Sequence, residues 1–267
     1  MTTVQQLLQR RRLLEASRVR HPRRVPKAVP PSGLIIAFTK VMRDLDQAMD
    51  DAILATLRDA GVVRTDDVLP VDLLRALEMT LERVTGRRAL VGVLEHLAER
   101  VSDRSGEDFQ RQVRSALGVN LLSDPQLAGL FTKFRDESLS RIRGLADEKI
   151  KKVRKLFEEA PVGQRVEVLE RDIREATGAT KARAALIARD QTLTLYSEVT
   201  QDRHKAAGIE RFVWSTSRDQ RVRPSHAELE NKEFSYANPP VVEGEPTLPG
   251  VTAYQCRCLA IPVLPTA

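Results

Sequence analysis

"TKARAALIARDQTLTLYSEVTQDRHKAAGIERFVWST", residues 180–216, changes its hydrophobic period at Gly208. Before this glycine the stretch has the spacing of one long helix, and Gly208 is suited to end it because glycine readily adopts the left-handed conformation of a helix C-terminus. After it, Phe212, Trp214 and Thr216 occupy every second position, which predicts a strand. The stretch therefore predicts a helical region followed by a small unit that contains strands.

The composition favours packed helices over a large sheet. Of the 267 residues, 42% are hydrophobic and 30% are charged, but only 4% are aromatic, so aliphatic residues must form most of the core. No apolar run approaches the roughly 20 residues that cross a bilayer, and the first residues lack a secretory signal. We expect a mainly α N-terminal and central region with a small α+β C-terminal module, and no contact with membranes.

Helical periodicity begins at Gly33. Apolar residues recur every three or four positions from Phe38 to Leu57, and a second helix is expected from Pro70, a suitable first-turn residue, to Gly86. Shorter helices are expected at 88–101 and 107–117. Loops are expected at 62–69 and 102–106.

A second helical region follows. Ser123 or Asp124 is expected to cap a long helix that runs to Phe157. The next helix begins near Val166 and is expected to stop at Thr177-Gly178, before the long helix that closes at Gly208. Within that last helix, "IARDQT" (residues 187–192) is interpreted as a hydrated polar face. The predicted domains are an N-terminal arm (1–32), a helical region (33–120), a stalk-like long-helix region (121–208) and the C-terminal module (209–267).

The positive charge of the chain is concentrated in the N-terminal arm. Residues 1–32 hold eight basic residues against one acidic residue, Glu15, whereas the remaining 235 residues hold 35 basic and 36 acidic residues. Four prolines in "HPRRVPKAVPPSG" exclude a continuous helix there. Such an arm is expected to bind DNA phosphates or an acidic protein surface; the alternatives are a solvated tail and an Arg-rich transit peptide. The candidate contact residues are Arg10, Arg11, Arg12, Arg18, Arg20, Arg23, Arg24 and Lys27.

The C-terminal module is predicted to contain about sixty residues. Strands are expected around 210–216, at "EFSY" and at "YQCRCLAIPV", with a short helix from Pro224 to Glu230. A domain of this size buries a modest fraction of its surface and often requires a disulfide or a metal ion. Because the chain has only two cysteines, no disulfide framework is available, and a reducing compartment is expected.

Cys256 and Cys258 are candidate metal ligands. In an extended strand, residues i and i+2 point to the same side, so the two sulfurs would lie together. His226 is the expected third ligand of a structural zinc site, and Asp219 or water is the fourth. The alternative is that the cysteines are small buried strand residues and that His226 is a polar group at a helix end. Trp214 is expected in the core of the module.

Several motifs in a fixed order resemble the phage Mu F-like head morphogenesis family of minor capsid proteins. They are "ATKARAALIARDQT", "WSTSRDQRVRPSH", the Pro239-Pro240 loop and "CRC" near the end, within residues 120–264. One departure is Glu230-Asn231, where members of the family usually have Asp-Gly; asparagine also tolerates the left-handed conformation of such a turn. In relatives, the segment matching "RVRPSH" can read as Cys-Pro-x-Cys, which places a cysteine at the position of His226.

The resemblance implies a structural protein of a tailed phage or prophage. It implies association with the portal protein in the capsid interior, contact with major capsid or scaffold protein, and assembly in the host cytoplasm. The sequence lacks GxxxxGK[ST], HExxH, GxSxG and CxxC motifs, so we do not expect an enzyme. The alternatives are a nucleic-acid-binding protein that acts through its basic arm and a zinc-dependent hydrolase.

Overall fold

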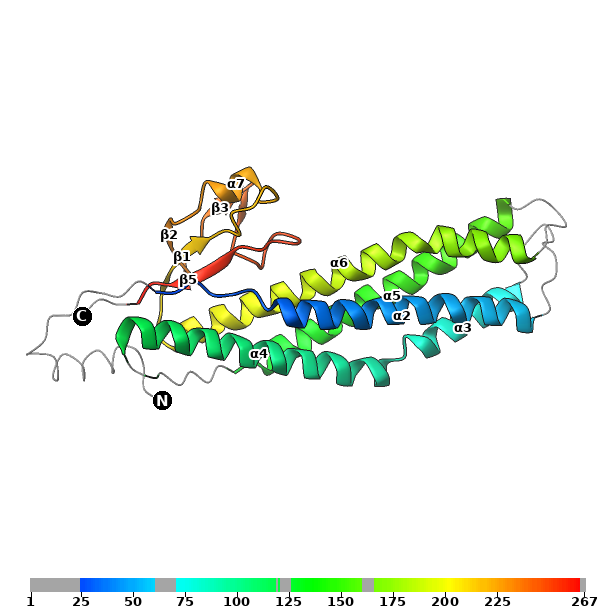
Figure 1. The fold of residues 1–267 in the computed structure, drawn as a ribbon, viewed down its shortest axis with the longest axis horizontal. Coiled ribbons are helices and arrows are strands. Elements are labelled where there is room, and N and C mark those ends of the chain that lie inside the picture. Colours follow the sequence, from blue (N-terminus) through cyan, green and yellow to red (C-terminus); the bar gives the residue numbers. More distant parts are fainter. Residues whose placement is uncertain (1–24, 61–70, 119, 121–125, 160–165, 265–267) are drawn as a thin grey trace, which may run out of the picture. The chain divides into compact units, whose positions relative to one another are not determined.

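The computed structural model describes residues 25–60, 71–118, 120, 126–159 and 166–264, which form two compact units (Figure 1). The module-bearing unit comprises the described residues of Met1–Leu34, Leu97–Thr132 and Asp190–Ala267. The helical unit comprises those of Ile35–His96 and Lys133–Arg189. The prediction of a mainly helical chain with a small C-terminal α+β module is confirmed.

Helices account for most of the described chain, and two of them are longer than predicted. They are α2 (Ser32–Asp59), α3 (Val71–Val84), α4 (Arg87–Leu117), α5 (Ala128–Glu159), α6 (Val166–Ala206) and α7 (Pro224–Ala227). The predicted loop at 102–106 is wrong, because α4 continues through it. The buried side chains of Val101, Ser105 and Phe109 outweigh the weak helix propensity of Gly106.

The predicted break at Thr177-Gly178 is also wrong, because α6 runs through it. The Thr177 hydroxyl donates a hydrogen bond to the carbonyl of Ile173, 2.8 Å away, and the Thr180 hydroxyl donates one to the carbonyl of Thr177. Both threonines are buried, so these bonds satisfy their hydroxyl groups within the helix. The residue types at Thr177-Gly178 predicted a helix end, but burial of this segment keeps the helix continuous.

Polar contacts connect α2 with α3, α5 and α6 in the helical unit, around an aliphatic core. Arg58 of α2 binds Glu170 of α6, and the Thr56 hydroxyl lies 3.3 Å from that of Thr80 on α3. Lys149 of α5 lies 2.6 Å from the Asp50 carboxylate of α2. The apolar core of the unit includes Met42, Met49, Ile53, Leu57, Leu77, Leu81, Ile142, Leu145, Val153 and Ile173.

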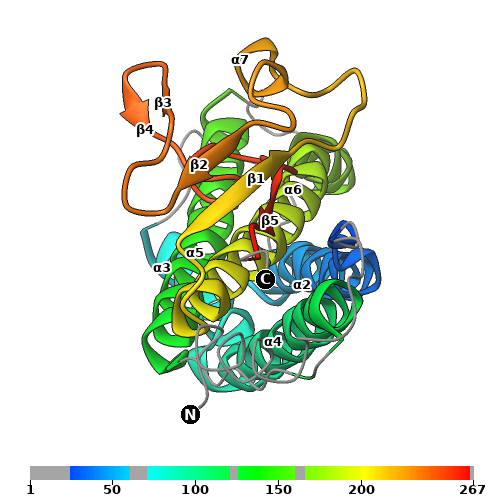
Figure 2. The same ribbon diagram turned by 90° about the vertical axis from the view of Figure 1, so that its left-hand side faces the viewer.

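The C-terminal module is built on a three-stranded antiparallel sheet in the order β2-β1-β5 (Figure 2). The strands are β1 (Arg211–Ser215), β2 (Glu233–Ser235) and β5 (Leu259–Pro262), and a second pair consists of β3 (Val241–Val242) and β4 (Glu245–Pro246). Phe212 and Trp214 of β1 are fully buried, which confirms the predicted core position of Trp214.

The predicted helix end at Gly208 is confirmed, and it sets the start of the sheet. Gly208 has φ of +75°, and the amide of Ile209 donates to the carbonyl of His204. This closing turn lets Ile209 pack with Phe109 and Val113 of α4 and with Leu264. The end of α6 is therefore packed against both α4 and the C-terminal segment.

The prediction that "IARDQT" forms a hydrated polar face is wrong. Asp190, Gln191 and Thr192 are all buried. The Asp190 carboxylate accepts a hydrogen bond from the amide of Gln255, at 2.6 Å, and the Gln201 side chain donates one to the carbonyl of Pro249. These polar residues of α6 therefore hold the loop that leads to the two cysteines.

Candidate metal centre

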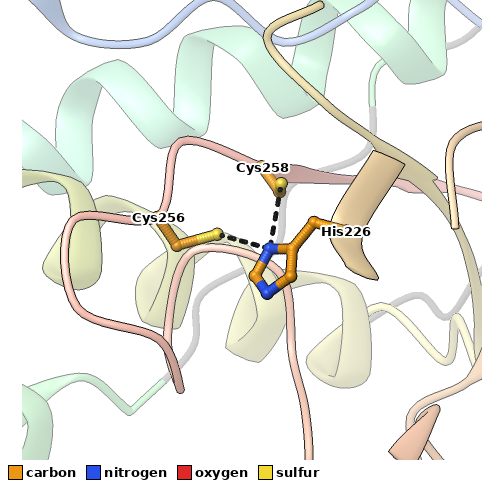
Figure 3. A group of neighbouring side chains, drawn as sticks. All are labelled: His226, Cys256 and Cys258. Atoms are coloured by element: carbon orange, nitrogen blue, oxygen red, sulfur yellow. Dashed lines mark hydrogen bonds between the residues drawn. The ribbon is translucent and has the colours of Figure 1, made fainter. Parts of the chain in front are cut away.

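His226, Cys256 and Cys258 converge in the C-terminal module (Figure 3). The Nδ1 atom of His226 lies 3.5 Å from the Cys256 sulfur and 3.6 Å from the Cys258 sulfur. All three residues are buried, and their ligand atoms lie within 4.8 Å of one another. A buried group of one imidazole and two thiols is a donor set that suits zinc.

His226 is positioned by the short helix α7. Pro224 stands at the first helical position, as the sequence predicts, and the amides of His226 and Ala227 both donate to the carbonyl of Arg223. The ring of Trp214 packs edge-on against the imidazole, with 5.4 Å between ring centroids and 88° between planes. The single tryptophan of the chain therefore contacts a candidate ligand directly.

The cysteines do not lie in a strand. The expectation that strand alternation places their two sulfurs on the same side is therefore wrong. Strand β5 begins at Leu259, and Gln255 has φ of +55°, which belongs to a turn. The amide of Cys256 donates to the carbonyl of Ala253, and this turn brings the two sulfurs toward the same point. The predicted neighbours do come together, but through a turn held by Asp190 of α6.

The backbone around the cysteine loop approaches α6 closely at Gly250. This residue has φ of +76°, and a Cβ atom built there would overlap the side chain of Ser197 on α6. The amides of Gly250 and Cys258 both donate hydrogen bonds to the Cys256 sulfur. Such N–H···S bonds favour a thiolate over a thiol. Glycine is needed at position 250 because of the positive φ and the close approach to Ser197.

The two thiols have strongly different proton affinities. The pKa of Cys256 is lowered because the Cys258 thiol donates a hydrogen bond to its sulfur, and the pKa of Cys258 is raised by the same bond. The indole N–H of Trp214 is buried close to the Cys258 sulfur, yet it meets no acceptor in good hydrogen-bond geometry among the described residues. The centre thus has the character of one thiolate and one thiol.

Asp219, the predicted fourth ligand, does not join this group. Its carboxylate forms a two-pronged ion pair with Arg257, in which the Nη2–Oδ1 distance is 2.6 Å, and it accepts a hydrogen bond from the amide of Arg221. The hydrogen bonds from Arg257 lower the pKa of Asp219 to about 2. The sequence interpretation missed Arg257, although it stands between the two cysteines and could have been recognised from that position.

Most of the candidate arm residues (Arg10, Arg11, Arg12, Arg18, Arg20, Arg23 and Arg24) lie outside the described residues. Lys27 is described, and its ammonium lies 3.7 Å from the Glu230 carboxylate. Val25 packs against the core around Phe109, and the carbonyl of Pro26 accepts a hydrogen bond from Gln112 of α4. The end of the predicted arm is thus part of the module-bearing unit.

Of the helices in the described ranges, none combines the length and the apolar character that a membrane span requires.

Comparison with known proteins found similarity to a family model and to a curated protein. Residues 151–261 match the family described as "Phage Mu protein F like protein", which confirms the resemblance predicted from the motifs. A protein of Haemophilus influenzae, described as "Uncharacterized protein", is 33% identical over 158 residues, which cover 59% of this chain and 34% of that relative. The chain thus spans about a third of that relative's length. No solved structure matches the chain.

Proposed function

We propose that this chain, which resembles the phage Mu F-like family over residues 151–261, is a minor head protein of a tailed phage or prophage. One observation carries the proposal: the matched residues contain the whole of the folded C-terminal module up to Ile261. The motifs that resemble the family supply its core and its candidate ligands, namely Trp214, His226 and the two cysteines. The resemblance therefore rests on residues of the module's core and of its candidate metal site, and not on amino-acid composition alone.

The proposed partner is the portal protein, inside the capsid. A minor head protein that acts in assembly must bind a component of the head, and the helical unit offers long helices for such contacts. Major capsid and scaffold proteins are further candidate partners. Because the related protein is about three times longer than the matched part, the partners of this chain are proposed for the chain itself and are not transferred from that relative.

The test is co-expression of this chain with the portal protein of the same phage genome, followed by size-exclusion chromatography. We expect the two chains to elute together, and the protein to be present in purified heads. A portal from an unrelated tailed phage is the control and should not retain the chain. If neither the matched portal nor purified heads contain the chain, the proposed function is wrong.

A contact with packaged DNA is proposed for the basic arm. Seven of its eight candidate residues precede the described segment, whereas Lys27 already faces Glu230. Residues 25–31 should be retained in a truncated chain, because Val25, Pro26 and Ala28 pack in the module-bearing unit. A chain that lacks residues 1–24 therefore loses the seven candidate arginines and keeps the packing of residues 25–31.

Filter binding of both chains to duplex DNA over a salt series tests this contact. If all seven arginines contact phosphates, the logarithm of the binding constant should fall with the logarithm of salt concentration with a slope of about −6. The truncated chain should lose most of that slope. Equal affinity and equal slope for both chains would contradict the DNA contact. If the truncation abolishes head assembly while portal binding persists, the alternative of a nucleic-acid-binding protein acting through its arm is favoured.

A further inference from the structure

We propose that His226, Cys256 and Cys258 bind one zinc ion, with a water molecule as fourth ligand, and that this ion stabilises the C-terminal module. The proposal concerns a metal site, and it does not depend on whether the chain binds a portal. It rests on the distances between the three side chains, on the space beside them, and on the small core of the module.

The distances fit a tetrahedral ion. With Zn–S bonds of about 2.3 Å and Zn–N bonds of about 2.0–2.1 Å, tetrahedral geometry places each sulfur about 3.5 Å from the nitrogen and the two sulfurs about 3.8 Å apart. The observed separations of the His226 nitrogen from the two sulfurs are 3.5 Å and 3.6 Å. One zinc ion can therefore reach all three atoms with little movement of the chain.

The fourth position is accounted for by a small cavity. Among the described residues, no other histidine, cysteine or acidic side chain joins the group, and Asp219 is held by Arg257. The cavity is lined by the three ligands and by Arg221, Arg223 and Gln255, and its volume is about 20 Å³. A cavity needs about 10–15 Å³ to hold a water molecule, so this space can hold one water.

The charges also balance. Binding would release the remaining thiol proton to solvent, so that two thiolates would neutralise the charge of one Zn²⁺. The amides of Gly250 and Cys258 already direct their N–H groups at the Cys256 sulfur, as they would in a bound thiolate. Zinc bound by two thiolates, the imidazole and one water would thus form a neutral, four-coordinate centre.

The ion would join two parts of the module that are distant in sequence. His226 lies on α7, whereas the cysteines lie 30 and 32 residues later, in the turn before β5. The buried core of the module contains five residues, Phe212, Trp214, Ala260 and the two cysteines, and partly buried hydrophobic residues such as Leu229 and Ala253 pack around them. The two candidate ligands from the turn therefore make up two of the five buried core residues. In small domains with such a limited core, metal binding supplies a large part of the folding free energy.

The experiment uses the full chain, purified without chelator and analysed by native mass spectrometry. We expect one equivalent of zinc per chain. Removal of the ion with a chelator should lower Tm by about 10 °C or more, and zinc should restore it. Cobalt added to the metal-free chain should give thiolate-to-cobalt charge-transfer bands and change the fluorescence of Trp214, which packs on His226.

Two variants test the ligand set. Cys258→Ser should lose the equivalent of metal and the charge-transfer bands, whereas the matched control Asp219→Asn should keep both. Because Cys258→Ser could fail to fold, alkylation of the thiols in the unaltered chain provides an independent measurement. Zinc should slow alkylation of both cysteines about tenfold or more, and the chelator should reverse this protection.

Several results would overturn the proposal. A metal-free chain whose Tm does not change on addition of chelator or zinc would remove the site. A Cys256–Cys258 disulfide in protein prepared without oxidant would also remove it, as would retention of the metal by Cys258→Ser. Zinc-dependent hydrolysis of nucleic acid would contradict the stabilising role and favour a hydrolase that uses the water position. None of these outcomes depends on the portal.

Discussion

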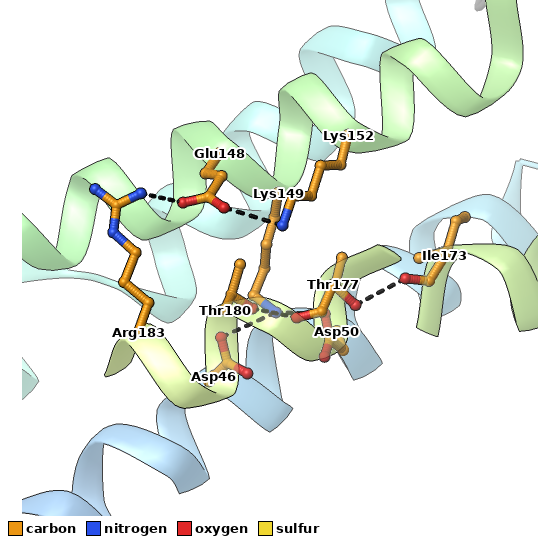
Figure 4. A network of polar contacts seen from close by, with 9 residues as sticks. All are labelled: Asp46, Asp50, Glu148, Lys149, Lys152, Ile173, Thr177, Thr180 and Arg183. Carbon is orange, nitrogen blue, oxygen red and sulfur yellow. Dashed lines mark hydrogen bonds and ion pairs between the residues drawn. The ribbon is translucent and has the colours of Figure 1, made fainter. Parts of the chain in front are cut away.

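Each unit of the molecule buries a cluster of ionisable side chains, and a comparison of one cluster from each unit shows two ways of holding such groups. In the helical unit, Lys149 of α5 lies 3.0 Å from the Asp46 carboxylate and 2.6 Å from that of Asp50, both on α2 (Figure 4). In the module-bearing unit, the cluster consists of His226, Cys256 and Cys258, with no carboxylate among its members. The first cluster is completed by the chain itself, whereas the second has the donors of a metal site.

The difference follows from the amount of structure around each cluster. Lys149 is fully buried beneath long helices whose packed faces hold the ion pairs in place, with Thr177 and Thr180 of α6 beside them (Figure 4). The C-terminal module has strands of three to five residues in its main sheet and a helix of four residues. A well-packed helical unit can hold a buried charge with its own side chains, and a small module gains more from an ion that draws its segments together.

The largest effect is expected from Lys149→Met. This change leaves two aspartates in the core without their cation, and breaking a buried ion pair in this way costs about 3–5 kcal/mol. The matched control is Lys152→Met, which removes a half-buried i,i+4 pair with Glu148 on the same helix and should cost less than about 1 kcal/mol. Urea unfolding followed by circular dichroism measures both. Equal losses would show that the buried pair does not stabilise the unit more than a surface pair.

A triple variant tests whether the loss of stability in Lys149→Met comes from the two aspartates left without a cation. Lys149→Met combined with Asp46→Asn and Asp50→Asn removes all three charges, so it should recover part of the stability lost by Lys149→Met alone. If the triple variant is less stable than the single one, the aspartates stabilise the helical unit through contacts other than those with Lys149.

Gly250→Ala should destabilise the module-bearing unit by about 3 kcal/mol. The new methyl group would overlap Ser197, and the residue would keep a positive φ. Gly244→Ala is the control, because Gly244 also has a positive φ, +88°, but no atom lies within 4 Å of the added Cβ. The change at Gly250 should therefore lower the stability more and should also weaken zinc binding, since the Gly250 amide faces the Cys256 sulfur. Thermal unfolding followed by Trp214 fluorescence measures the difference, and equal effects would indicate that only backbone strain matters.

A pH effect of about 2 kcal/mol between pH 7 and pH 5 is expected from His204. Burial lowers the pKa of this histidine from 6.5 to about 3, and its Nδ1 atom lies 2.6 Å from the Tyr236 hydroxyl. Below pH 6.5 the unfolded chain binds a proton that the folded chain does not, so stability falls as the pH decreases from about 6.5 towards 3. His204→Gln should reduce this slope in urea titrations at a series of pH values. An unchanged slope would assign the effect to other groups.

The smallest effect is expected from Arg58→Ala. Arg58 forms a two-pronged ion pair with Glu170, with both N–O distances at 2.6 Å, but its side chain is 58% exposed. Water and salt screen such a pair, so the Tm should change only slightly, and the change should vanish in 1 M salt. A large loss that persists at high salt would mean that the pair holds α2 and α6 together, in the same way as Lys149 holds α2 and α5.

The sequence correctly predicted which residues meet in the module, but not the geometry by which they meet. His226 and the two cysteines were chosen by residue type, and the structure brings them together. Their meeting was expected from the alternation of a strand, whereas it is the Ala253–Cys256 turn, held by Asp190 of α6, that produces it. Asp219 was chosen in the same way as His226, but Arg257 binds its carboxylate. A contact between residues distant in the sequence cannot be deduced from local periodicity.

By itself, the sequence determined the helical class, the end of α6 at Gly208, the strand with Trp214 in the core, and the resemblance to phage Mu F-like proteins. These features depend on local spacing or on the order of motifs, which the chain carries without reference to its fold. Only the tertiary structure decided that α4 and α6 continue through their glycines, that Asp190 is buried, and that Lys149 faces two aspartates. The physical reason is that burial can outweigh local propensity, and burial depends on segments that meet only after the chain has folded.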